Sequence, residues 1–185
     1  MDEPKSEETH NGASFDHDPK DPAVVEESMT VSPDASSMTS VDFNLIYGRQ
    51  RSAMVRLARF LTGSLEVAEE LVQEAFVKLQ FAPTVVQDPE YYLRTIVANL
   101  SRGHLRRMRL ERAFRPEVRI VLAAPEIDET WAALCRLPFR QRAVLALRYY
   151  DDLSEAEIAR VLGCRIGTVK SSHHRAVAAL RRELS

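Results

Sequence analysis

The chain has 185 residues, of which 45% are hydrophobic and 28% charged, and its formal net charge is −2. These are the proportions of a globular protein with room for one ordinary domain or two small ones. There is no run of about eighteen apolar residues, which argues against a membrane-spanning helix, and the acidic N-terminus lacks the apolar core of a secretory signal. The two isolated cysteines, Cys135 and Cys164, suit neither a disulfide framework nor a zinc site, and no glycine-rich phosphate loop occurs.

The small net charge is the sum of two unlike parts. Residues 1–42 contain 2 basic and 11 acidic side chains and so carry a charge of −9. Residues 43–185 contain the other 23 basic and 16 acidic side chains and so carry +7. A basic body behind an acidic extension is typical of a protein that binds nucleic acid or another polyanion.

The acidic segment at residues 1–42 is predicted to be a disordered extension. Prolines, serines and threonines stand among its acidic residues, and its apolar residues follow no period. Such a segment cannot bury enough apolar surface to offset the entropy lost on ordering.

Three helices are predicted within residues 43–113. The first ends before Gly63, and Ser64 is placed to cap the second. The second helix has an apolar stripe and, opposite it, a polar and mostly acidic face. Asp88 and Pro89 are the N-cap and first-residue signals of the third helix, whose second half is rich in arginine.

Residues 114–126 contain two prolines and no clear period, which predicts a linker. Helical periodicity returns in residues 127–185 with one helix before Pro138 and another after it, in which Tyr150 is predicted to face inward. No pattern indicates a β-hairpin. The predicted fold is therefore all-α, with two small helical domains joined by a flexible linker.

The C-terminal stretch predicts a helix-turn-helix. Ser154 and Glu157 have the spacing of a capping box, and Gly163 supplies a left-handed end to the short helix that follows the box. A second helix begins near Gly167, with His173 on its inward face and a polar, basic outer face. Such a helix can enter the DNA major groove, whereas a helical hairpin with a solvated cationic face would not need this combination of cap, glycine and charge.

The motifs taken together resemble the extracytoplasmic-function (ECF, group IV) class of bacterial sigma-70 type RNA polymerase sigma factors. The helix of region 2.2, which docks on the polymerase clamp in that class, is similar to EVAEELVQEAFVKL. Regions 2.3 and 2.4, which melt and read the minus-ten element, resemble YYLRTIVANLSRGHLRR. Region 4, which reads the minus-thirty-five element, resembles LPFRQRAVLALRYYDDLSEAEIARVLGCRIGTVKSSHHRAVAALRREL. The resemblance makes residues 43–113 region 2 and residues 127–185 region 4.

The resemblance implies what the chain does and with what. It implies a non-catalytic subunit that binds core RNA polymerase and directs promoter recognition and melting in the cytoplasm. It further implies an inhibitory anti-sigma factor as a partner, and neither a cofactor nor a metal.

The resemblance also implies three sets of binding residues. Those for the duplex minus-thirty-five element are Arg165, Thr168, Lys170, Ser171, His174 and Arg175. Those for the opened minus-ten strand are Asn99, Arg102, Arg106 and Arg107, of which the arginines can grip phosphates. Those for core polymerase are Glu69, Glu70, Gln73 and Glu74.

The sequence departs from the family pattern at the recognition helix. Arg165 stands where proline is common, and Ser172-His173 stands where arginine-leucine is common. These departures bear on which minus-thirty-five sequence is read. Tyr91 and Tyr92 could stack on a base, although core packing is expected for at least one of them.

Two other classes of protein fit the sequence less well. A stand-alone helix-turn-helix regulator would need a dimer and a receiver or ligand domain, and residues 43–113 show no alternation of strands and helices. An enzyme would need convergent catalytic groups, but the adjacent acids Asp151 and Asp152 fit an ordinary loop after a helix, and no nucleophile-base set is apparent.

Overall fold

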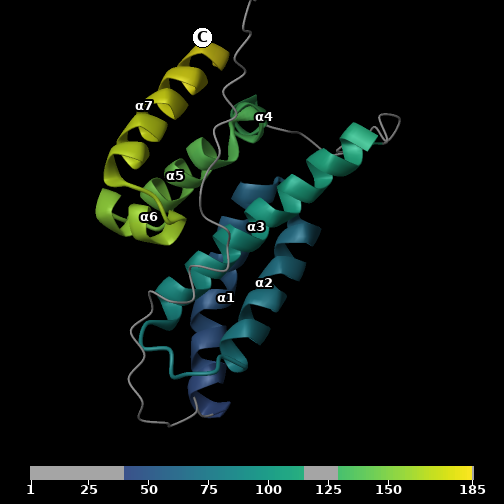
Figure 1. The fold of residues 1–185 in the computed structure, drawn as a ribbon, viewed down its shortest axis with the longest axis vertical. Coiled ribbons are helices and arrows are strands. Elements are labelled where there is room, and N and C mark those ends of the chain that lie inside the picture. The colour runs from purple at the N-terminus through teal and green to yellow at the C-terminus, as the bar shows by residue number, and fades with distance from the viewer. Residues whose placement is uncertain (1–39, 115–128, 185) are drawn as a thin grey trace, which may run out of the picture. The chain divides into compact units, whose positions relative to one another are not determined.

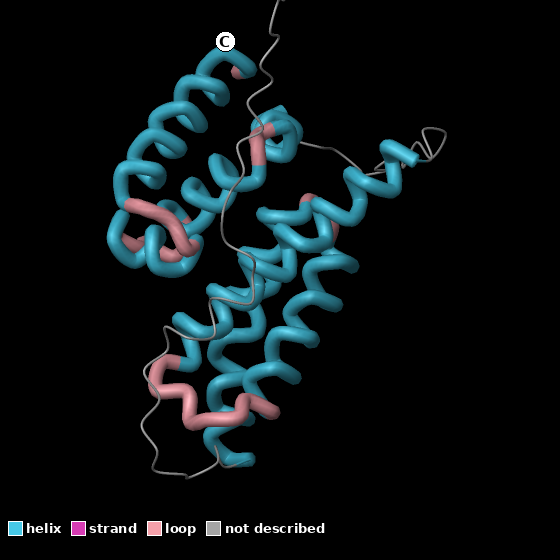
Figure 2. The backbone as a smooth tube through the Cα atoms, in the orientation of Figure 1, coloured by secondary structure: helices cyan, strands magenta, loops and turns pink. Residues whose placement is uncertain are grey.

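The computed structural model describes residues 40–114 and 129–184. Seven helices follow in chain order within them: α1 (Ser40–Thr62), α2 (Leu65–Gln80), α3 (Pro89–Phe114), α4 (Glu129–Arg136), α5 (Phe139–Tyr149), α6 (Glu155–Leu162) and α7 (Ile166–Glu183). Helices and the turns between them account for all of the described chain (Figure 2), which confirms the all-α prediction.

The predicted extension and linker fall largely outside the described residues. The helix α1 begins at Ser40, so residues 40–42 belong to it and not to the extension. The predicted linker loses Phe114 to α3, and its remaining residues are not described.

The helices α1, α2 and α3 pack side by side along their lengths (Figure 1). Their apolar stripes meet in a core with fully buried side chains such as Met54, Leu61 and Leu93. Both predicted helix starts are confirmed. The Ser64 side chain accepts a hydrogen bond from the Val67 amide at the start of α2, and Asp88 Oδ1 accepts one of 2.9 Å from the Tyr91 amide at the start of α3.

The helix-turn-helix is formed by α6 and α7 as predicted. Both halves of the capping box are present: Ser154 Oγ accepts from the Glu157 amide (3.3 Å), and Glu157 Oε2 accepts from the Ser154 amide (2.8 Å). Gly163 ends α6 with a φ of 60°, a left-handed conformation that glycine adopts without strain.

Of two side chains that were predicted to face inward, one does not and the other does so only in part. Tyr150 is 64% exposed, because α5 ends at Tyr149 and the ring of Tyr150 lies on the surface against the edge of Phe60. His173 is half-buried, and the buried residue of that turn of α7 is its neighbour Ser172.

One continuous cluster of buried side chains joins the N-terminal and C-terminal helices. It contains Leu57 and Leu61 of α1, Val97 of α3, Leu147 of α5 and Ile158 of α6. A second, smaller cluster holds α7 against α5. None of the described helices is both long and apolar enough to cross a lipid bilayer.

Candidate DNA-binding and polymerase-binding surfaces

The first turns of α7 present the residues predicted to meet duplex DNA. Four of the six are exposed and two, Thr168 and Ser171, are half-buried; the exposed ones are Arg165, Lys170, His174 and Arg175. The first turn of α7 contains no acidic residue. Free backbone N–H groups and the helix dipole at such an end favour a phosphate. The six residues lie at the N-cap and in the first three turns of α7, near that end.

Hydrogen bonds along α7 orient Arg175. Its Nε donates to the Ser171 carbonyl oxygen and its Nη2 to Ser171 Oγ, both at 3.2 Å. Ser171 Oγ in turn donates to the Thr168 carbonyl oxygen at 3.1 Å. The guanidinium is thus held along the helix surface. Lys170 has an acidic neighbour, since its Nζ lies 3.6 Å from Glu155 Oε2.

The two residues that depart from the family pattern are used in packing. Ser172 is buried between α7 and its neighbours. His173 Nε2 lies 3.0 Å from the hydroxyl of Tyr149, and the two rings are 5.9 Å apart. The turn of α7 that these residues occupy is therefore tied to the end of α5.

The four predicted minus-ten residues of α3 fall into two pairs. Arg106 and Arg107 are exposed, whereas Asn99 and Arg102 are half-buried. Arg102 Nη2 donates to the Leu162 carbonyl oxygen at 3.4 Å. The Arg102 guanidinium also lies 5.4 Å from the centre of the Phe139 ring, within the range of a cation–π contact.

Both tyrosines at the start of α3 have partners within the chain. The Tyr91 hydroxyl donates to the Arg160 carbonyl oxygen at 3.3 Å, and the Arg160 guanidinium lies 4.7 Å from the Tyr91 ring centre. The Tyr92 hydroxyl donates to the Lys78 carbonyl oxygen at 3.4 Å. Each ring is half-buried, which agrees with packing for both.

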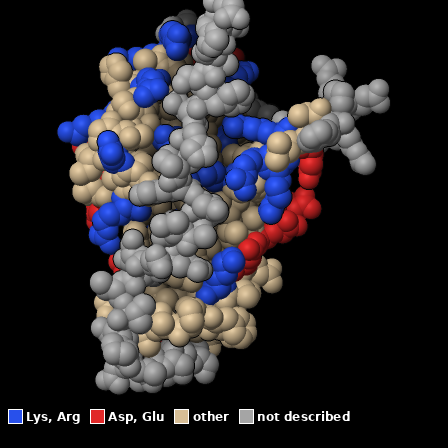
Figure 3. Space-filling model, viewed as in Figure 1, with Lys and Arg blue, Asp and Glu red and all other residues tan. Residues whose placement is uncertain are grey.

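The four residues predicted to meet the polymerase share the outer face of α2. Glu69, Glu70, Gln73 and Glu74 are all exposed, and the buried residues of α2 lie opposite them. Figure 3 shows acidic side chains gathered along one edge of the molecule beside a run of basic ones. Two of the acids have a cation nearby: Arg51 lies 3.6 Å from Glu69, and Lys78 lies 3.7 Å from Glu74.

A groove of about 350 Å³ beside this acidic face was missed by the sequence analysis. Glu69 and Gln73 form part of its wall, and the aromatic rings of Tyr47 and Phe76, 4.8 Å apart, form another part. Tyr47 belongs to α1 and Phe76 to α2, so the groove exists only because the two helices pair. The groove offers a slot with two aromatic rings and several polar side chains in its walls, next to a row of carboxylates.

Comparison with known proteins decides the family. The family described as sigma-70 region 2 matches residues 46–111, and sigma-70 region 4 matches residues 127–180. The RNA polymerase sigma-E factor of Streptomyces coelicolor is 30% identical over 156 residues, which cover 78% of this chain and 86% of that protein. The ECF RNA polymerase sigma factor SigL of Mycobacterium tuberculosis is 34% identical over 150 residues, covering 74% and 85%.

The chain belongs to the ECF class of sigma-70 factors. As a member of this class it directs promoter-specific initiation by RNA polymerase and is not itself an enzyme. Among the described residues, no group of His, Cys, Asp and Glu side chains is arranged to hold a metal ion.

Solved structures give the same fold. The sigma factor RpoE in its complex with the anti-sigma factor NepR from Bartonella quintana has a TM-score of 0.63 and 25% identity, over 77% of this chain and 96% of that one. CnrH, in complex with the cytosolic domain of CnrY, has a TM-score of 0.57 and 23% identity, over 79% and 89%.

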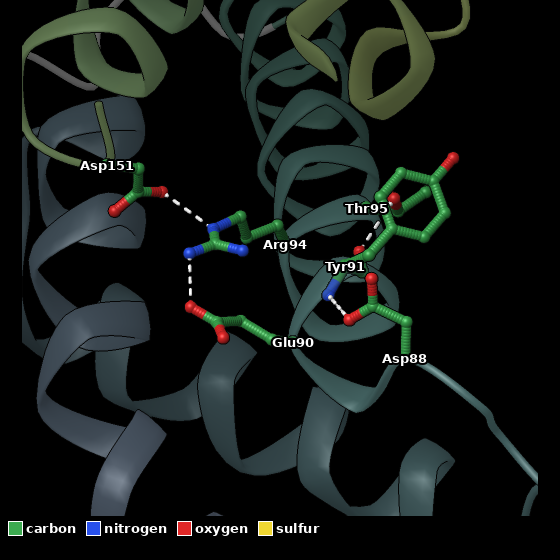
Figure 4. A network of polar contacts seen from close by, with 6 residues as sticks. All are labelled: Asp88, Glu90, Tyr91, Arg94, Thr95 and Asp151. Atoms are coloured by element: carbon green, nitrogen blue, oxygen red, sulfur yellow. Dashed lines mark hydrogen bonds and ion pairs between the residues drawn. The ribbon is translucent and has the colours of Figure 1, made fainter. Parts of the chain in front are cut away.

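Arg94 and Arg142 of the ECF sigma factor make further polar contacts between region 2 and region 4 that the sequence analysis did not anticipate. Arg94 of α3 binds Glu90 one turn earlier, and its Nε donates to Asp151 Oδ2 at 3.1 Å (Figure 4). Burial raises the pKa of the Asp151 carboxyl, and the Arg94 cation opposes that shift. Asp152, by contrast, is exposed and has a φ of 51°. The two adjacent acids therefore have different roles.

The second of these arginines is Arg142 of α5, which is 5% exposed. Its Nη1 donates to the Cys135 carbonyl oxygen at 3.0 Å, and its Nη2 donates to the Leu61 carbonyl oxygen at the end of α1. Burial lowers the pKa of this guanidinium. Nothing in the local pattern of α5 marks Arg142 as buried, because its partners are carbonyl groups of distant helices.

Proposed function

We propose that the ECF sigma factor reads the duplex minus-thirty-five element with the first turns of α7. The observation that supports this most strongly is the set of six polar and basic side chains gathered at a helix end without an acidic residue in its first turn. Arginine can bind guanine through two hydrogen bonds, and Ser, Thr and Lys can reach bases or phosphates. Arg175 has the best position for a base, because Ser171 already orients its guanidinium.

The arginine-rich half of α3 is proposed to hold the opened minus-ten strand. Arg106 and Arg107 are exposed and available to phosphates. Asn99 has an amide that could bind the edge of a flipped base. Arg102 would join this set when its bond to the Leu162 carbonyl oxygen is broken.

Core RNA polymerase is proposed to bind the outer face of α2. A row of exposed carboxylates beside a groove with aromatic walls fits a partner helix that carries basic residues and one or two large apolar side chains. Glu69, Glu70, Gln73 and Glu74 would meet the basic residues, and the slot at Tyr47 and Phe76 would take the apolar one.

An anti-sigma factor is proposed as a second protein partner, and the cytoplasm as the place of action. One structure with the same fold, that of RpoE, was solved as a complex of a sigma factor with the anti-sigma factor NepR. The inhibitor of this chain would need to cover one of the surfaces described above.

The test is transcription in vitro with bacterial core RNA polymerase on a library of randomised promoters. We expect transcripts only when the sigma factor is added, from promoters that share two short motifs separated by a fixed spacer. The alternative, a stand-alone helix-turn-helix regulator, predicts tight binding of the free protein to a duplex operator and no transcript that depends on it. Quadruple substitution of the α2 face, E69A/E70A/Q73A/E74A, should abolish binding to core polymerase while the protein stays folded.

A further inference from the structure

We propose that His173 and Tyr149 are positioning residues for the recognition helix α7. Their contact fixes the rotation of α7 about its own axis and so determines which minus-thirty-five sequence the ECF sigma factor prefers. This inference rests on the proposed function of α7. The pair acts through Ser171, His174 and Arg175, which lie on the same turns of α7 and are proposed to meet the DNA.

The helix α7 lies alongside α5 (Figure 1), and an apolar seam holds the two helices together. Leu145 of α5 and Ala176 of α7 are both buried in this seam. Tyr149 follows Leu145 by one helical turn, and His173 precedes Ala176 by one turn. The pair therefore continues the seam toward the end of α7 that carries the residues proposed to read DNA.

The contact between His173 and Tyr149 differs from the rest of the seam because it is polar and directional. The Tyr149 hydroxyl lies 3.0 Å from His173 Nε2, which is a hydrogen-bond distance, and the ring centroids are 5.9 Å apart. Apolar burial has no preferred direction, whereas a hydrogen bond weakens steeply as its angle becomes unfavourable. Tyr149 is 66% exposed, so burial contributes little and the hydrogen bond defines the geometry of this contact.

The position of His173 around the helix gives this contact control over rotation. Val169 and Ala176 are almost completely buried, and they lie within about 20° of each other around α7 because seven residues make nearly two turns. His173 lies about 40° to one side of Val169. A contact directly beneath the helix axis sets the distance between two helices, whereas a contact to one side resists rotation of the helix.

A small rotation of α7 would move all of its DNA-reading side chains together. The outer surface of a helix lies ~6 Å from its axis, so a rotation of about 10° moves an atom there by ~1 Å. A shift of this size is enough to spoil a pair of hydrogen bonds between an arginine and a guanine. Ser171 already holds the Arg175 guanidinium along α7. The rotation of the whole helix is then the remaining variable, and the Tyr149–His173 contact restricts it.

The polar contact depends on a departure from the family pattern, in which leucine is common at the position of His173. A leucine could pack against the Tyr149 ring but could not form a hydrogen bond with its hydroxyl. We therefore expect the histidine to give this chain a minus-thirty-five preference that differs from that of a leucine variant.

The experiment is transcription with core RNA polymerase from a library in which only the minus-thirty-five positions are randomised. The minus-ten element is kept as the unsubstituted chain selects it. Tyr149→Phe keeps the ring and removes the hydroxyl. It should lower the preference for the best base over the next best about threefold at one or more minus-thirty-five positions. His173→Gln, whose side-chain amide can replace Nε2 as the partner of the hydroxyl, should retain the preference.

Tyr150→Phe is the matched control, because Tyr150 is the next residue along the chain and is 64% exposed. It removes a hydroxyl in the same way and should leave the preference unchanged. His173→Leu should alter the preference, and adding Tyr149→Phe to it should cause no further change, because the two side chains share a single contact.

Thermal unfolding of each variant separates positioning from stability. A purely structural contact would lower the melting temperature and reduce transcription from every promoter by the same factor, with the base preference intact, and that result would overturn the inference. An equal loss of preference in Tyr150→Phe would also contradict it. Failure of the proposed function has a different signature, since the unsubstituted chain would then give no sigma-dependent transcript from any promoter of the library.

Discussion

At the scale of single residues, the buried cation Arg142 is the clearest example of a side chain whose role depends on distant partners. It joins the end of α1 to α4 and α5 through two carbonyl groups. Its Nε has no hydrogen-bond partner among the residues that the structure describes. A buried carbonyl group that loses its hydrogen-bond donor still carries the free-energy cost of its removal from water. Loss of the Arg142 guanidinium would therefore destabilise the fold through these two carbonyl groups.

Replacement of Arg142 by methionine should therefore destabilise the protein. Methionine keeps the approximate volume but leaves the carbonyl oxygens of Leu61 and Cys135 without this donor. We expect a loss of roughly 1–3 kcal/mol in the free energy of unfolding, measured by urea denaturation. Arg182→Met, at an exposed position near the end of α7, is the control and should change stability by less than about 0.5 kcal/mol.

Arg175 is the residue at which DNA recognition should be most sensitive. If Arg175 reads a base, Arg175→Ala should weaken promoter-specific binding by roughly 1–3 kcal/mol and relax the sequence preference at one position. Transcription from the randomised library shows both effects. Arg182→Ala, at the far end of α7, should weaken binding far less and leave the preference intact; an identical effect of the two substitutions would contradict base reading by Arg175.

At the scale of secondary-structure elements, sequence reasoning worked where the signals were local. The caps at Ser64, Asp88 and Ser154 were predicted because each lies within three residues of its partner amide. The outer face of α2 was predicted because helical periodicity alone separates it from the apolar stripe. The inward position of Tyr150 was wrong, because the end of α5 depends on packing between helices.

The Glu157 carboxyl in the capping box of α6 should make the free energy of unfolding depend on pH. Hydrogen bonds from Ser154 lower the pKa of Glu157. A carboxyl whose pKa is depressed in the folded state stabilises the fold above its ordinary pKa, and this contribution is lost as the pH falls through the depressed value. Glu157→Gln should flatten the acid side of the stability curve, measured by thermal unfolding from neutral pH to about pH 3. Glu155→Gln, in the same turn, is the control; an equal flattening by both would refute the assignment to Glu157.

At the scale of the whole molecule, charge and topology were predictable and the contacts between regions were not. Order and spacing of the motifs were sufficient to predict two helical regions. The contact of Arg94 with Asp151 joins residues 57 positions apart, and that of Arg142 with Leu61 joins residues 81 apart. Periodicity contains no information on such pairs, so both arginines resembled ordinary charged surface residues.

The acidic N-terminal segment should act on DNA binding through its charge alone. Residues 1–39, which precede α1, contain 2 basic and 10 acidic side chains. Their removal should raise the affinity of the free protein for DNA at low salt, because these acids compete with phosphates for the basic helices. The difference, measured by fluorescence anisotropy, should fade as salt shortens the Debye length below about 10 Å. Equal affinities of the two proteins at low salt would show that the segment is inert.

The core that α1, α3, α5 and α6 share determines how cooperatively the protein unfolds. Two domains with separate cores unfold in separate transitions, whereas helices that share buried side chains lose them together. Leu61 and Ile158 lie in one cluster although they come from different regions. The free protein should thus melt in a single transition, and a core substitution in region 4 would lower the thermal stability of region 2 as well. A defect in promoter melting could then originate from a residue that never approaches the minus-ten element.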